Sequence, residues 1–234
     1  MALLFNPIAL ADDAYTVFKR LSREVQTTVA KGKAVDKSAF AQSVKTLRDT
    51  FEHRGQRHLM TYEGANLAEK LAQNERADLA SILYGVLIKS NINNPLLVEE
   101  FAQKGLALAR KTKDPIHIMA RLDDLNHLYR TTEYGSKKHF KILCQEKEIL
   151  KKIVRNYDDA VRRYNTISRQ ALPKNHYEFM LCGIRMELAK IIMDKNPFIA
   201  LTELEAAEKI IYKYGDGTLT TRIKMLLDEV YARL

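Results

Sequence analysis

The chain has 234 residues, of which 46% are hydrophobic and 29% charged, and its formal net charge is +9. This composition excludes wholesale disorder, and the length is enough to bury a core as one large domain or one elongated array. Gly (9) and Pro (5) are sparse, and because β-rich folds need many turn residues, an all-helical protein is expected. No apolar run approaches the roughly 18 residues that a membrane-spanning helix needs.

Prolines mark the predicted helix starts. Four of the five follow Asn or Asp, at Asn6-Pro7, Asn94-Pro95, Asp114-Pro115 and Asn196-Pro197. An Asn or Asp side chain accepts hydrogen bonds from the free N–H groups of a first helical turn, and Pro fits the first helical position. Each pair therefore predicts a helix start. The fifth proline, Pro173, follows a long helical pattern and predicts a break.

Helical periodicity between these marks predicts the elements in chain order. The expected helices cover 8–31, 37–54, 58–73, 75–90, 95–112, 115–133, 137–171, 175–194, 197–214 and 218–233. The segment 58–73 is either a separate helix or the continuation of 37–54. Short links between the helices predict that consecutive helices pack antiparallel.

The segment 137–171 is unusually long for one helix. From Leu150 its apolar residues recur every three or four positions, at Leu150, Ile153, Tyr157, Ala160, Tyr164, Ile167 and Ala171. A break near Asn156 would disturb this rhythm, so we expect one continuous helix with a narrow apolar seam.

A short motif repeats along the chain. Ala102-x3-Leu106-x2-Ala109 recurs as Ala200-x3-Leu204-x2-Ala207 and as Ala160-x3-Tyr164-x2-Ile167. Small residues at its ends let two helices approach closely. The segment from Tyr157 to Tyr164 (YDDAVRRY) resembles the second helix of a tetratricopeptide repeat (TPR). The run from Gly105 to Lys113, followed by Leu122 to Tyr129 (LDDLNHLY), resembles the junction between successive units of that family.

The TPR-like resemblance implies an α-solenoid of antiparallel helix pairs over 37–234, a superhelix with pairs beginning near 37, 75, 115, 175 and 218. Residues 1–36 would form an N-terminal helix or cap, continuous with this domain. The family's Trp is absent, and Asn126 replaces its Gly. Generic helix packing and a compact irregular bundle are the structural alternatives.

The resemblance also implies a function, because this family holds partners on the surface lined by the first helix of each pair. The expected role is a non-enzymatic protein- or peptide-binding scaffold. When Leu83, Leu125 and Ile184 are matched to the family's core leucine, the predicted partner-binding residues are Lys89, Asp123, His127, Arg130, Met186 and Lys190, with Ser81 and Cys182 beside them. The cations would favour an acidic peptide or a C-terminal carboxylate.

Charge is concentrated in one segment. Residues 137–174 hold eleven Lys or Arg and four Asp or Glu, a local net charge of +7 out of +9. The predicted basic stripe consists of Lys141, Lys152, Arg155, Arg162 and Arg169. Such a stripe can contact phosphates, so binding of a nucleic-acid backbone is the alternative function, and a solvated helix face is the simpler interpretation.

No motif of catalysis or metal binding is found. The chain lacks a Gly-rich phosphate loop, paired Cys ligands, His-Glu-x-x-His and Gly-x-Ser-x-Gly, so neither an enzyme, a metal nor a cofactor is predicted. His53 and His58 would not share a helix face. Asp123 and His127 come nearest to a site but fit a solvent-facing pair. The histidines at 117, 139 and 176 are interpreted as structural.

The cysteines and the N-terminus bear on the compartment. Cys144 and Cys182 match no metal spacing and predict two buried free thiols in a cytoplasmic protein, with one disulfide as the alternative. The segment from Met1 to Ala11 lacks the basic start of a signal peptide, and Asn6-Pro7 interrupts its apolar stretch, so it is interpreted as the lead-in to the first helix.

Overall fold

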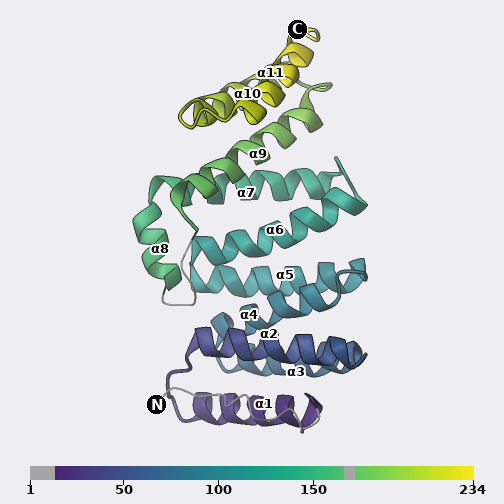
Figure 1. Cartoon of the computed structure of the whole chain (residues 1–234), viewed down its shortest axis with the longest axis vertical. Helices are drawn as coiled ribbons and strands as arrows, with labels where there is room; N and C mark the ends of the chain where they lie inside the picture. Colours follow the sequence, from purple (N-terminus) through teal and green to yellow (C-terminus); the bar gives the residue numbers. More distant parts are fainter. Residues whose placement is uncertain (1–13, 166–171) are drawn as a thin grey trace. The chain divides into compact units, whose positions relative to one another are not determined.

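The computed structural model describes residues 14–165 and 172–234, and all regular structure in these ranges is helical (Figure 1). This confirms the predicted all-α fold class. The helices are α1 (Ala14–Ala30), α2 (Lys37–His53), α3 (Arg57–Gln73), α4 (Ala77–Ser90), α5 (Pro95–Thr112), α6 (Pro115–Thr132), α7 (Lys137–Arg155), α8 (Tyr157–Asn165), α9 (Lys174–Ile192), α10 (Pro197–Tyr212) and α11 (Gly217–Tyr231).

The predicted capping residues perform that role. Asn94 Oδ1 accepts a hydrogen bond from Leu97 N at 3.3 Å, and Asn196 Oδ1 accepts one from Ile199 N at 3.1 Å. Asp114 Oδ1 accepts from Ile116 N at 2.9 Å. These bonds satisfy N–H groups of the first turn that have no partner inside the helix. Asn6-Pro7 lies outside the described residues.

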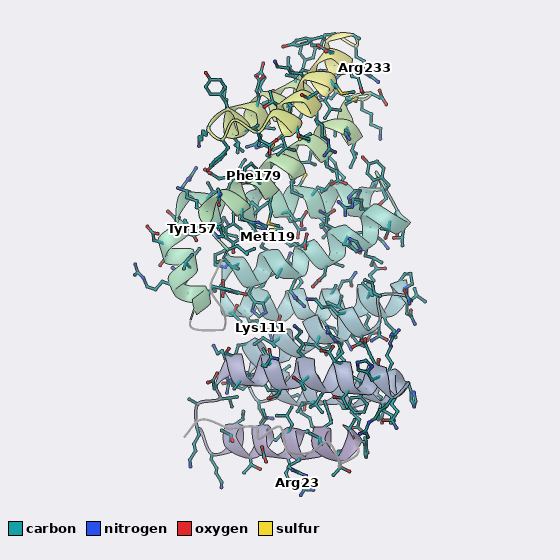
Figure 2. The ribbon with its side chains drawn as sticks, viewed as in Figure 1. Arg23, Lys111, Met119, Tyr157, Phe179 and Arg233 are labelled. Carbon is teal, nitrogen blue, oxygen red and sulfur yellow. The ribbon has the colours of Figure 1, made fainter. Side chains whose placement is uncertain are left out.

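The prediction of one continuous helix over 137–171 is wrong. Asn156 has φ −120° and ψ 47°, which ends α7 at Arg155, and α8 begins at Tyr157 in a different direction (Figure 1). Asn readily leaves helical geometry. The apolar residues keep their three-four spacing past Asn156 because α7 and α8 each pack an apolar face against a neighbouring helix. Tyr157, labelled in Figure 2, packs its ring 6.2 Å from that of Tyr177 and donates to Leu172 O at 2.8 Å.

The chain divides into two compact units. Of the described residues, the first unit holds 14–124 and 163–165. Within it α1 packs on α2 and α3, α3 on α4, α4 on α5, and α2 on α4. Each helix thus contacts the other helix of its pair, and the helices of one pair contact the first helix of the next pair. The predicted pairs starting near 37 and 75 require this arrangement. Gly55, with φ +67°, separates α2 from α3, so 58–73 is a helix of its own.

The second unit holds 125–162 and 172–234 of the described residues. Within it α7 packs on α9, α9 on α10, α10 on α11, and α9 on α11. The alanine motif lies at these contacts, with Ala200, Leu204 and Ala207 fully buried on α10. Its copy on α5 in the first unit is buried too, at Ala102, Leu106 and Ala109. The motif is therefore a helix-packing motif. The division into a cap at 1–36 and an array over 37–234 stays a prediction.

Two glycines of the first unit make room for a buried arginine. Arg121 on α6 has a side chain only 12% exposed, and its Nη1 lies 3.1 Å from Asp124 Oδ2. A Cβ added to Gly85 on α4 would stand 2.3 Å from Arg121 Nη1, and one added to Gly105 on α5 would stand 3.1 Å from Arg121 Cδ. The absence of these carbons lets the arginine lie against two neighbouring helices.

Gly85→Ala is expected to destabilise the protein by about 1–3 kcal/mol, because the added methyl group overlaps the guanidinium of Arg121. Urea denaturation of the full chain measures this. The matched control is Gly183→Ala on α9, where a Cβ would meet no atom within 4 Å. There the helix preference of Ala should stabilise by up to about 1 kcal/mol. Equal stabilities of the two variants would contradict the packing role of Gly85.

Candidate functional site

A serine–histidine pair is buried in the first unit. Ser81 Oγ donates to Gly105 O at 3.0 Å and lies 3.0 Å from His117 Nε2. Because the hydroxyl proton is directed to the carbonyl, Nε2–H of His117 donates to Ser81. Burial, together with the smaller effect of the Arg121 charge, lowers the pKa of His117 to about 4. Ser81 is 0% and His117 6% exposed, so the pair joins α4, α5 and α6 and offers no surface to a substrate.

A second buried polar chain lies in the second unit. Nδ2 of Asn126 on α6 donates to Glu146 Oε2 at 2.7 Å, and Asn126 Oδ1 lies 3.1 Å from His139 Nε2. Gly135 N donates to His139 Nδ1 at 3.2 Å, which leaves Nε2 as the protonated nitrogen. The amide of Asn126, which stands where the TPR resemblance expects a glycine, joins α6 to α7 through these bonds. The structural interpretation of His117 and His139 agrees with their burial.

The ion pairs of the second unit also join helices. Glu203 on α10 accepts from Lys147 Nζ on α7 at 2.6 Å and from Arg185 Nη1 on α9 at 2.5 Å. The three side chains are 11%, 17% and 13% exposed, respectively. Because charges this buried need partners, the carboxylate holds α7, α9 and α10 in one arrangement.

An open groove of about 400 Å³ lies between α9 and α11 of the second unit. Its lining residues are Lys190, Met193, Arg222, Met225, Leu226 and Glu229. Met193 and Leu226 are buried and form the apolar floor, whereas Met225 is 60% exposed at the rim. Lys190, Arg222 and Glu229 are exposed. The groove therefore combines an apolar floor with two cations and one carboxylate.

Five of the predicted partner-binding residues are exposed: Lys89, Asp123, His127, Arg130 and Lys190. Met186 is not, and its assignment to a binding surface is wrong. It is 5% exposed and packs in a core with Cys182, Ala189 and Ala200, because it lies on the stripe of α9 that faces α10. Cys182 is buried in the same core, and Ser81 is buried in the first unit, so neither can line a surface.

Two predicted residues of the second unit meet around one carboxylate. Arg130 on α6 and Lys190 on α9 both act electrostatically on Glu187, one turn before Lys190. Burial raises the pKa of Glu187, and these two cations oppose that rise. His127 belongs to the same unit as this cluster, whereas Lys89 and Asp123 belong to the first unit.

Four members of the predicted basic stripe are exposed, at Lys141, Lys152, Arg155 and Arg162, and Arg169 lies outside the described residues. Lys141 and Lys152, eleven residues apart on α7, share a helix face. Arg162 is on α8, however, so the stripe is interrupted at Asn156 and is not one straight row. Glu148, paired with Lys151 at 2.9 Å, also lies toward this face and reduces its charge.

Arg222, Met225 and Glu229 were not predicted as site residues. The match to the family's core leucine rests on Leu83, Leu125 and Ile184 and does not extend to the last helix. One signal was present in the sequence. Lys190-x2-Met193 and Arg222-x2-Met225 repeat the same cation-to-methionine spacing on two first helices of pairs.

The two thiols differ in exposure. Both cysteines are free, Cys182 is buried, and Cys144 is only partly buried, so the prediction of two buried thiols holds for Cys182. Burial raises the pKa of Cys182 to about 11. In 14–165 and 172–234, no helix has the length and apolarity to cross a bilayer, and no three His, Cys, Asp or Glu residues are grouped to hold a metal ion.

Comparison with known proteins adds no family. The chain matches no model of a protein family and no curated protein.

The stability of the protein is expected to depend on pH through His117. The unfolded imidazole has a pKa of 6.5 and the folded one about 4, so between these values only the unfolded chain binds the proton. The contribution is complete above pH 6.5 and is lost as the pH falls toward 4, by about 3 kcal/mol.

His117→Gln keeps an amide donor for Ser81 and cannot titrate. Urea denaturation gives the unfolding free energies of wild type and this variant at about pH 7 and about pH 4. The difference between the two proteins should change by about 3 kcal/mol from one pH to the other. His58→Gln, at an exposed position, should lose as much stability on acidification as the wild type does. A pH-independent difference for His117→Gln would contradict the assignment.

Proposed function

We propose that the chain is a non-enzymatic protein- or peptide-binding scaffold and that the groove between α9 and α11 holds the partner. One observation supports this above the others. The groove exposes Met225 and two cations, Lys190 and Arg222, over a floor of buried apolar side chains.

The physical properties of the groove suit a polypeptide. Methionine is unbranched and polarisable, so the exposed Met225 can adapt to different apolar side chains above the floor of Met193 and Leu226. A volume of about 400 Å³ lies within the range of pockets that bind ligands through an apolar lining and a few polar groups. The groove is open rather than enclosed, which favours a segment of a larger molecule over a small metabolite.

The packing scheme supports the same proposal. In each unit the first helices of consecutive pairs contact one another, α2 with α4 and α9 with α11. In TPR-like arrays this row of first helices lines the binding surface. A continuous superhelix through both units is part of this proposal, as is a cytoplasmic location, which the free thiol of Cys182 fits.

The scaffold proposal predicts groove-dependent peptide binding. The full chain is used to select peptides from a random display library, and the dissociation constants of selected peptides are measured by fluorescence anisotropy. Lys190→Glu and Arg222→Glu should each weaken binding by about tenfold, because each replaces an attractive charge at the groove with a repulsive one.

The matched controls are Lys209→Glu on α10 and Lys224→Glu on α11, which change exposed lysines outside the groove lining. These variants should bind within about twofold of wild type. Failure to select any peptide, or equal losses in groove and control variants, would refute the proposal.

Binding of a nucleic-acid backbone is a second candidate, favoured by the exposure of Lys141, Lys152, Arg155 and Arg162 on α7 and α8. Each phosphate that such a cation neutralises releases counterions, so affinity should fall steeply with salt. The measurement is a salt titration with generic duplex and single-stranded DNA and RNA. Reversal of Lys152 and Arg155 should weaken binding and reduce the salt slope, whereas Lys209→Glu should change neither. No binding at low salt would exclude this function.

A further inference from the structure

The charges of the groove are arranged along its length. Short links and direct packing make α10 antiparallel to both α9 and α11, so α9 and α11 run in the same direction (Figure 1). On each of these two helices a cation precedes a methionine by three residues, as Lys190 precedes Met193 and Arg222 precedes Met225. Along α11, the cation Arg222 therefore lies toward one end of the lining and the carboxylate Glu229 toward the other.

The spacing on α11 is that of successive helical turns. Arg222, Met225 and Glu229 follow one another at three and four residues, so the cation, the apolar side chain and the carboxylate lie on one face. Seven residues from Arg222 to Glu229 correspond to about 10 Å along the axis. A complementary surface needs an acid, an apolar group and a base at the same intervals.

The chemistry of the lining favours a helical occupant. Five of the lining residues lie on α9 and α11, where most backbone N–H and C=O groups are bonded within the helix, and Met193 directly follows the last residue of α9. An extended peptide on this apolar floor would leave its own backbone groups without partners, whereas a helix satisfies them internally. Helix-in-groove recognition also relies on anchors at i, i+3 or i+4, and i+7.

We propose that the groove binds an amphipathic helix of a partner protein that carries a carboxylate, a large apolar side chain and a cation on successive turns. The carboxylate pairs with Arg222, the apolar side chain packs on Met225, and the cation pairs with Glu229. This inference rests on the proposed scaffold function and specifies the chemistry of its partner.

Synthetic helical peptides test the pattern on the full chain. They share an Ala-rich background and differ at positions i, i+3 and i+7, which carry Glu-Leu-Lys, Lys-Leu-Lys, Glu-Leu-Glu or Glu-Ala-Lys. The Glu-Leu-Lys peptide should bind at least about tenfold more tightly than each of the others. A proline in its central turn should abolish binding, because it breaks the helix.

Charge exchange supplies the matched protein test. Arg222→Glu should weaken the Glu-Leu-Lys peptide and strengthen the Lys-Leu-Lys peptide, whereas Lys224→Glu on the opposite side of α11 should do neither. Equal binding of the two peptides to wild type, or an equal response of both protein variants, overturns the inference.

The outcomes separate the two proposals. If peptides from the random library bind the groove but the Glu-Leu-Lys peptide does not, the helical pattern is wrong and the scaffold function stands. If binding survives the central proline, the occupant is not a helix. If neither the library peptides nor the designed peptides bind, both proposals are wrong.

Discussion

The structure depends on the burial of one apolar face of each helix pair against the next pair. A single pair of amphipathic helices is too small to cover its own apolar surface, so stability requires a neighbour. How closely the neighbours approach is set by small residues at the contacts. Ala102 and Ala109 on α5, like Ala200 and Ala207 on α10, are fully buried. A larger side chain at these points would separate the helices and lose contacts along their length.

Buried polar groups restrict which packing arrangement is adopted. Apolar surfaces alone tolerate several relative positions of two helices, whereas a buried polar group is stable only where its partner stands. Glu203 meets both of its cations only when α7, α9 and α10 are assembled as observed. Arg121 needs two glycines on two other helices. These contacts give each unit a defined register, and their loss would leave charges buried without compensation.

The groove is a consequence of the same packing scheme. α9 packs closely along α10, whose alanines allow a short separation, but it meets α11 less extensively. The floor between α9 and α11 is filled by Met193 and Leu226, and the space above them stays open. The groove is therefore the part of the second unit that the pairing of consecutive helices leaves uncovered.

The sequence by itself determined the local structure. Asn94, Asn196 and Asp114 cap helices where predicted, because a cap depends only on residues within one turn. The alanine motif indicated buried helix contacts, because small residues at a helix interface allow two helices to approach closely. Lys190, which is predicted on a partner-binding surface, is exposed on α9, and its binding role stays a prediction.

Tertiary structure decided what depends on which neighbour a face meets. Apolar periodicity indicates that a residue is buried but not which neighbour buries it. It therefore predicts a helix that continues past Asn156, where the chain turns toward a different neighbour. For the same reason Met186 was placed on the surface, although it faces α10. Arg222 lines the groove only because α11 packs beside α9. Their contact joins segments about thirty residues apart, and no local pattern encodes the relative position of such segments.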